Sequence, residues 1–92
     1  MAHTIRQKTK LLNRVRRIRG QIEAIERALE AEKGCAHVLH SIAAVRGAIN
    51  GLMAEVLADH IRTHVADPAT DPDADRAKGA EEIIDVVHAY LK

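Results

Sequence analysis

The stretch KLLNRVRRIRGQIEAIERALE, residues 10–30, decides the fold because its apolar residues recur at alternating steps of four and three. These residues are Leu11, Val15, Ile18, Ile22, Ile25 and Leu29. Such spacing places them on one stripe of an α-helix, as in a coiled coil. Thr4 is a plausible N-cap for this helix, and Lys33-Gly34 supplies a stop signal. The sequence therefore predicts a long first helix that packs along most of its length.

A second long helix is predicted from Cys35 onward, and it carries two adjacent apolar rows. The first row comprises Val38, Ile42, Val45, Ile49, Leu52 and Val56, and the second includes Leu39, Met53, Leu57, His60 and His64. Two rows require burial on more than one side of the helix, which a lone hairpin does not provide. We therefore expect partner chains to cover part of this helix.

A third, shorter helix is predicted over residues 74–91. Its apolar stripe consists of Ile83, Ile84, Val87 and Leu91. Asp67-Pro68 ends the second helix, and the acidic, proline-containing segment up to Asp75 is typical of a solvated connector. No strand pattern is apparent. The expected fold class is all-α, a three-helix protomer built on a long antiparallel helical hairpin.

Composition sets the scale of the protein. A chain of 92 residues forms one domain, residues 1–92, and buries only a modest core unless partner chains complete it. The single cysteine, Cys35, excludes an intrachain disulfide framework. We recognise no signal peptide and no long uncharged apolar stretch, so we expect a cytoplasmic protein without a membrane partner.

Positive charge is concentrated at the start of the chain. Seven of the fourteen Lys and Arg residues precede the first acidic residue, Glu23. The other seven share the rest of the chain with all thirteen acidic residues. Such segregation indicates one anion-binding face.

The basic first helix is suited to double-stranded DNA, since its side chains can neutralise several phosphates. Lys10, Arg14 and Arg17 fall nearly on one face, and Arg16 and Arg19 are expected to widen this patch. The absence of interleaved aromatic residues argues against single strands or RNA loops. No helix-turn-helix is apparent, so we expect a flat surface that contacts the DNA backbone and senses groove shape. The alternative is the solvated flank of a coiled coil.

Four cysteine and histidine residues are candidates to hold a transition metal: His3, Cys35, His60 and His64. Cys35 and His60 lie at opposite ends of the second helix, about 38 Å apart at 1.5 Å per residue. They therefore cannot meet within one chain. His60 and His64 share a helix face, as chelation by two imidazoles requires. No nucleophile–base pair is recognised within one chain, so no enzymatic activity is expected.

A second chain completes this site if two copies of the second helix pair antiparallel. Cys35 of one chain then lies beside His60 and His64 of the other, in two sites related by the dimer axis. The hairpin brings His3 near His64 of its own chain. One thiolate with three imidazoles suits nickel, cobalt or zinc, and a freed Ala2 amine as a further ligand would favour nickel or cobalt. The alternative is that the histidine pair only fills a surface or an interface.

Two segments resemble signature stretches of the CsoR/RcnR family of metal-sensing transcriptional repressors. They are RVRRIRGQ, residues 14–21, and IAAVRGAINGLM, residues 42–53. The resemblance covers essentially the whole chain. It implies an antiparallel dimer, a dimer-of-dimers tetramer, and release from operator DNA on effector binding, which derepresses metal efflux or resistance genes. It also implies DNA contacts for Arg14 and Arg17, with Arg46 a weaker candidate.

The ligand pattern within that family bears on the effector. His3, Cys35, His60 and His64 resemble the nickel- and cobalt-responsive branch, so the implied effector is Ni(II) or Co(II), with Zn(II) as a further candidate. Copper sensors of the family typically carry cysteine at the position of His64. The formaldehyde-responsive branch typically carries proline at the position of Ala2 and glutamate at that of His64. The alternative is nevertheless a formaldehyde-responsive repressor that uses Cys35 and the N-terminal amine.

Overall fold

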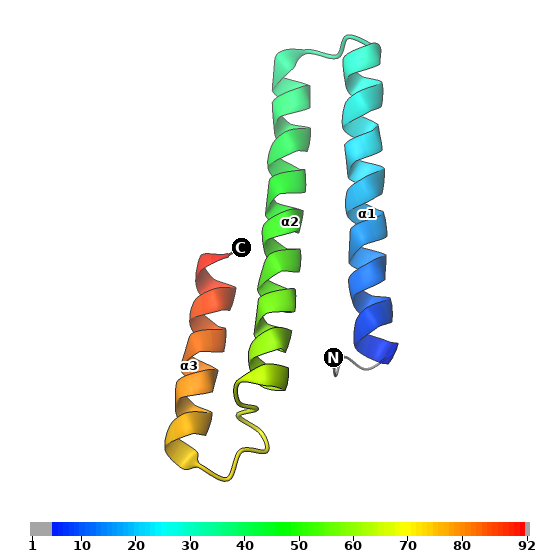
Figure 1. Ribbon diagram of the computed structural model, residues 1–92. Coiled ribbons are helices and arrows are strands. Elements are labelled where there is room, and N and C mark those ends of the chain that lie inside the picture. The colour runs from blue at the N-terminus through cyan, green and yellow to red at the C-terminus, as the bar shows by residue number, and fades with distance from the viewer. Residues whose placement is uncertain (1–4, 92) are drawn as a thin grey trace.

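The computed structural model describes residues 5–91, which form three α-helices. They are α1 (Ile5–Glu30), α2 (Cys35–His64) and α3 (Ala74–Tyr90). Figure 1 shows α1 and α2 as a long antiparallel hairpin, with α3 running back along the other side of α2. No strand occurs within these residues. The predicted all-α fold and its three helices are confirmed, while the predicted N-cap Thr4 lies outside the described residues.

The three helices lie side by side, and α2 is the middle one (Figure 1). It packs against both α1 and α3. The Cα positions span 57 × 26 × 13 Å, so the protomer is about one helix thick. A single layer of helices leaves two broad faces without protein cover, and the apolar rows of the hairpin are exposed there.

The turn between α1 and α2 differs from the predicted stop at Lys33-Gly34. Glu32 adopts the left-handed conformation with φ of 54°, whereas Gly34 has φ of −59°. The Glu32 amide donates to the Leu29 carbonyl at 3.1 Å, and the Lys33 amide donates to the Ala28 carbonyl at 2.9 Å. These two bonds form a Schellman motif that satisfies the last carbonyls of α1. The helix therefore ends through a glutamate in a conformation that glycine adopts at lower cost.

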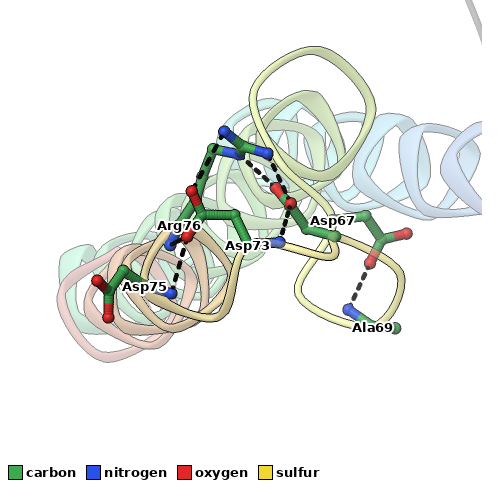
Figure 2. Close-up of polar contacts among 6 residues, drawn as sticks. Asp67, Ala69, Asp73, Asp75 and Arg76 are labelled. Atoms are coloured by element: carbon green, nitrogen blue, oxygen red, sulfur yellow. Dashed lines mark hydrogen bonds and ion pairs between the residues drawn. The ribbon is translucent and has the colours of Figure 1, made fainter.

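Aspartate side chains order the connector between α2 and α3. Asp67 accepts a hydrogen bond from the Ala69 amide at 2.9 Å, and Asp71 accepts one from the Asp73 amide at 2.9 Å. Asp73 is the N-cap of α3 and accepts from the Asp75 and Arg76 amides. Figure 2 shows these bonds together with the paired contacts of the Arg76 guanidinium. The connector is therefore acidic and partly exposed, since the Asp71 side chain is only 7% exposed, and it has a defined geometry.

The main hydrophobic core lies between α2 and α3. Its buried members are Ala54, Ala58, Ile61, Ala66, Ala80, Ile84 and Val87. Four of these seven are alanines, and small side chains allow two helices to approach closely. Ala58 at the centre is fully buried, with 0% exposure. The short α3 is therefore held by a small but continuous apolar contact.

The longer hairpin buries less apolar surface than its length suggests. Ile18 and Ala28 of α1 and Val45 of α2 are buried. Most of the large aliphatic residues in the predicted rows remain exposed: Val15, Ile22, Leu29, Leu39, Ile42, Ile49, Met53, Val56 and Leu57. Removing such residues from water is the dominant stabilising contribution to folding and to most protein association. The protomer thus leaves a large apolar surface for a partner.

Candidate functional site

Two of the four predicted metal ligands lie together near the end of α2. The ring centroids of His60 and His64 are 4.7 Å apart, with an angle of 41° between the ring planes. Both side chains are exposed. They project from consecutive turns of one regular helix, because residues four apart share a face. The pair is therefore accessible to a metal ion and spaced for chelation.

Cys35 lies at the opposite end of α2 and is exposed as a free thiol. The helix between Cys35 and His60 is continuous. At 3.6 residues per turn, the 25-residue separation brings Cys35 to within about 20° of His60 around the helix axis. Cysteine and histidine donors thus lie on the same face of α2, about 38 Å apart along it.

A complete metal site is not formed by one protomer within residues 5–91. No group of three or more cysteine, histidine, aspartate or glutamate side chains converges there. His3, the fourth predicted ligand, lies outside the described residues. The soft and borderline donors that the sequence offers fit Ni(II), Co(II) or Zn(II) in kind, and a complete set needs donors from outside residues 5–91 of one protomer.

An apolar groove lies between the two groups of donors. It has a volume of about 610 Å³ and is lined by Ile49, Leu52, Met53, Val56, Leu57 and His60. Ile49 and Met53 keep 42% and 48% of their surface exposed. The groove is continuous with the histidine pair through His60, so whatever covers it also approaches the candidate ligands.

The basic side chains of α1 do not all face solvent in the same way. Lys10 Nζ lies 3.8 Å from one carboxylate oxygen of Glu55, and Arg14 Nη1 lies 3.9 Å from the other. Arg14 Nη1 also donates to the Gly51 carbonyl at 3.3 Å. Two of the predicted DNA contacts are therefore turned toward α2 in the isolated protomer.

Gly51, of the Asn50-Gly51 pair inside α2, faces α1. Its carbonyl accepts the hydrogen bond from Arg14, and a Cβ at this position would lie 3.4 Å from Arg14 Nη2. That is an ordinary van der Waals distance, so the contact does not by itself require glycine, which is disfavoured within a helix. Gly51 thus marks a contact between the two helices of the hairpin, and nothing in the structure explains why it is glycine.

The remaining basic candidates are exposed but do not form one patch. Arg17 continues the face of Lys10 and Arg14, whereas Arg19 lies about 160° further round α1. Arg16 is also off that face, and its guanidinium donates to the Asn13 side chain at 3.2 Å. Arg16 and Arg19 therefore do not lie on the face of Lys10, Arg14 and Arg17 in a single protomer, and their contact with DNA stays a prediction. Arg46 is exposed on α2, away from this helix.

Sequence reasoning missed two acidic residues that lie against the basic helix. Glu55 meets Lys10 and Arg14, and the carboxylate of Asp59 accepts a hydrogen bond from Gln7 Nε2 at 3.0 Å. Asp59 is only 7% exposed and directly precedes His60. Glu55 and Asp59 are the two acidic residues of α2, and they are spaced i and i+4 on one face of the helix. That spacing was the available signal.

Comparison with known proteins assigns the class. The metal-sensitive transcriptional repressor family matches residues 7–89. The chain therefore belongs to this family of transcriptional repressors, which are not enzymes, and the predicted CsoR/RcnR relationship is confirmed. Family membership implies DNA binding and assembly into oligomers.

Individual relatives cover the whole chain. It is 41% identical over 92 residues to the transcriptional repressor RcnR of Salmonella arizonae, with 100% of both chains covered. A Serratia marcescens protein, described as an uncharacterized protein in the bioA 5′ region, is 52% identical over the same length and coverage. A solved glutamate-to-histidine variant of the formaldehyde-responsive regulator FrmR, from Salmonella enterica serovar Typhimurium, is 48% identical with a TM-score of 0.69. That match covers 97% of this chain and 99% of the FrmR chain.

One property of α2 also bears on how the chain assembles. By length and composition alone Cys35–His64 is apolar enough to cross a membrane, although charged Arg46, Glu55, Asp59 and Arg62 interrupt it. Only 17% of its most apolar window is buried within the protomer. Membership of a repressor family gives this apolar surface a different explanation, because a helix that pairs with other chains in solution has the same composition.

Proposed function

We propose that this protein represses transcription as an oligomer and leaves its operator DNA when Ni(II) or Co(II) binds. The proposed ligands are His3, His60 and His64 of one chain together with Cys35 of a second chain. The observation that carries the proposal is the placement of Cys35, His60 and His64 on one face of α2, at opposite ends of a continuous apolar surface.

Antiparallel pairing of two α2 helices through this face is the simplest arrangement that brings all of the proposed ligands together. When Cys35 of one chain is opposite the His60–His64 pair of the other, the two-fold axis passes close to Ile49, midway between them. The exposed residues around Ile49 then bury one another, including Met53 and Val56. Two equivalent metal sites result, one at each end of the contact. The same contact that stabilises the dimer thus assembles the ligands.

Pairing of two such dimers gives the proposed tetramer. We expect DNA phosphates to contact the face of α1 that carries Lys10, Arg14 and Arg17. Arg16 and Arg19, on other faces of α1, and Arg46 of α2 contact DNA only if the oligomer brings them to the same duplex. Such contacts are mostly to the sugar-phosphate backbone, so affinity falls steeply with salt. A bound Ni(II) or Co(II) supplies a difference in binding free energy between two conformers of the oligomer. Coupling of this kind is typically worth about 1 to 3 kcal/mol, or roughly 5-fold to 150-fold in DNA affinity.

Titration of the purified protein tests the proposal. A duplex selected from a random library by the wild-type protein serves as the probe, and DNA release is followed on addition of Ni(II), Co(II), Zn(II) or formaldehyde. We expect release by Ni(II) or Co(II), and loss of that response in His64→Gln and in Cys35→Ala. His40→Gln is the matched control, because this exposed histidine lies on the opposite face of α2. Retention of the full response in both ligand variants would exclude this site.

A formaldehyde-responsive repressor is the second candidate, and the similarity to FrmR favours it. In that case Cys35 and the N-terminal amine form the reactive pair, and His64 has no part in the response. Formaldehyde alone would then release the DNA, in the His64→Gln variant as well as in the wild type. The solved FrmR chain carries histidine in place of glutamate by substitution, whereas here His64 is present in the sequence itself.

The pH dependence of metal affinity tests the proposed ligands. Thiolate and neutral imidazole are the metal-binding forms, so metal affinity should fall as the pH is lowered. The metal affinity of Cys35→Ala should change less with pH than that of the wild type, because the variant has no thiol to deprotonate. A Ni(II) affinity that does not change with pH would contradict a cysteine/histidine site.

A further inference from the structure

A row of polar contacts joins the start of α1 to the second half of α2. We call it the polar seam; its members are Gln7, Lys10 and Arg14 of α1 and Gly51, Glu55 and Asp59 of α2. The contacts follow one another along the antiparallel hairpin, about one helical turn apart. Each joins a donor on α1 to an acceptor on α2.

Glu55 is central in this seam because its carboxylate is shared by two cations. One of its oxygens lies 3.8 Å from Lys10 Nζ and the other 3.9 Å from Arg14 Nη1. The Glu55 side chain is 29% exposed, that of Arg14 35% and that of Lys10 61%. The group is therefore accessible to solvent and to a large anionic ligand.

We propose that Glu55 occupies the place of a DNA phosphate in the free protein and competes with DNA for Lys10 and Arg14. A carboxylate and a phosphate diester oxygen are both anionic acceptors for ammonium and guanidinium groups. When the DNA backbone reaches α1, the two cations exchange the carboxylate for phosphate. Glu55 is thus a positioning residue that lowers DNA affinity, and the inference rests on the proposed role of α1 in DNA binding.

The geometry favours exchange over a permanent pair. Distances of 3.8 and 3.9 Å are longer than those of charge-assisted hydrogen bonds, and pairs of this exposure contribute little to stability. Arg14 has a second anchor, because its guanidinium donates to the Gly51 carbonyl at 3.3 Å. This anchor keeps Arg14 close to α2 and therefore within reach of Glu55. Lys10 has the more exposed side chain, so it is the freer of the two to turn toward DNA.

An opposite role for Glu55 is physically reasonable and gives the opposite result. If Glu55 served to hold Lys10 and Arg14 in the conformation that DNA requires, its loss would weaken binding. Competition predicts that its loss strengthens binding. The direction of the change therefore decides between the two.

The test compares Glu55→Gln with Glu82→Gln in the absence of effector. Both substitutions remove one negative charge, but Glu82 lies exposed on α3, outside the polar seam. The probe is the duplex selected from a random library by the wild-type protein, and Kd is measured over a range of salt. We expect Glu55→Gln to tighten binding about 3-fold to 10-fold beyond Glu82→Gln at low salt, with the gain shrinking as salt screens the charges. An equal or weaker affinity of Glu55→Gln would overturn the proposal.

A double-mutant cycle shows whether the change in DNA affinity depends on the contacts of Glu55 with Lys10 and Arg14. In a Lys10→Gln background, Glu55→Gln should give a smaller gain than in the wild type, since one competing cation is absent. An undiminished gain in both Lys10→Gln and Arg14→Gln would show that Glu55 acts through the general field, and the proposal would be wrong. Circular dichroism of each variant confirms the fold. If the wild-type protein selected no duplex at all, the proposed function itself would fail, which is a distinct result.

Discussion

The two helix contacts of this protomer differ in a way that their lengths do not suggest. The α2–α3 contact involves a helix of 17 residues, yet it contains the main buried cluster. The α1–α2 hairpin involves helices of 26 and 30 residues, but it leaves most of its large aliphatic residues exposed and closes through the polar seam. The α2–α3 contact buries its apolar residues within the chain, whereas the apolar rows of the hairpin stay exposed and are proposed to be covered by a second chain. Burial, and not helix length, therefore distinguishes the two contacts.

The largest effect is expected from a charge on the exposed apolar face of α2, which should disrupt assembly. Ile49→Asp places a charge beside the proposed two-fold axis, so each dimer would hold two facing carboxylates. Burying unpaired charges costs several kcal/mol, and about 3 kcal/mol already raises a dissociation constant by roughly 100-fold. Analytical ultracentrifugation over a range of concentrations should show a shift from oligomer to smaller species. Unchanged assembly would mean that this face does not pair with itself.

Ala44→Asp is the matched control for that experiment. Ala44 is exposed on the same helix but lies about 140° round from Ile49. The substitution adds the same charge without entering the proposed contact. Its sedimentation should therefore match that of the wild type.

The second prediction concerns the contact that is complete within the chain. Ile84 is 5% exposed between α3 and α2, whereas its neighbour Ile83 is 51% exposed. Ile84→Ala should lower the free energy of unfolding by about 2 to 4 kcal/mol, and Ile83→Ala by less than about 1 kcal/mol. Urea denaturation at one fixed protein concentration measures both, because assembly contributes to apparent stability. Equal losses would show that Ile83 is covered by another chain.

The sequence predicted the elements of this fold well because they depend on local patterns. The starts of α2 at Cys35 and of α3 at Ala74 agree with the predicted positions, and the second helix ends at His64, just before Asp67-Pro68. Apolar periodicity and helix-breaking residues act over a few positions, so one chain is enough to find them. The turn at Glu32 was missed because its residue type gives no sign of a left-handed conformation.

The candidate site was predictable only in part, because its key contacts join residues far apart in the sequence. The helix face shared by His60 and His64 follows from their spacing. The contact between Arg14 and Gly51 spans 37 positions, and that between Gln7 and Asp59 spans 52. Which residue of α2 faces a given residue of α1 depends on the register of the hairpin. The geometry of the turn sets that register, and local sequence patterns do not reveal it. For the same reason Glu55 was counted among the acidic residues of the chain and was not placed against the basic helix.

A substitution in the connector between α2 and α3 should lower stability less than Ile84→Ala does. Asp73 accepts from the Asp75 amide at 3.1 Å and from the Arg76 amide at 3.2 Å, which caps α3. Asp73→Ala should cost about 1 kcal/mol of unfolding free energy, whereas Asp73→Asn should cost little because asparagine caps equally well. Thermal denaturation followed by circular dichroism compares the two variants. Equal losses would indicate that the charge at this position matters more than the cap.

The smallest effect should depend on pH. Arg76 contacts Asp71 through two hydrogen bonds of 2.6 and 2.7 Å, and this contact lowers the pKa of the Asp71 carboxyl below its ordinary value of 3.8. Since the folded-state pKa is the lower one, the pair stabilises the folded protein fully above pH 3.8, and its contribution is lost as the pH falls through the lowered value. Arg76→Gln should therefore lower Tm slightly at neutral pH and not at all once Asp71 is protonated. Lys78→Gln is the control, because it removes the same charge from an exposed position on α3. The Tm change that it causes should not depend on the protonation of Asp71. A Tm difference for Arg76→Gln that persists unchanged into acid would mean that the arginine orders the connector by packing and not through its charge.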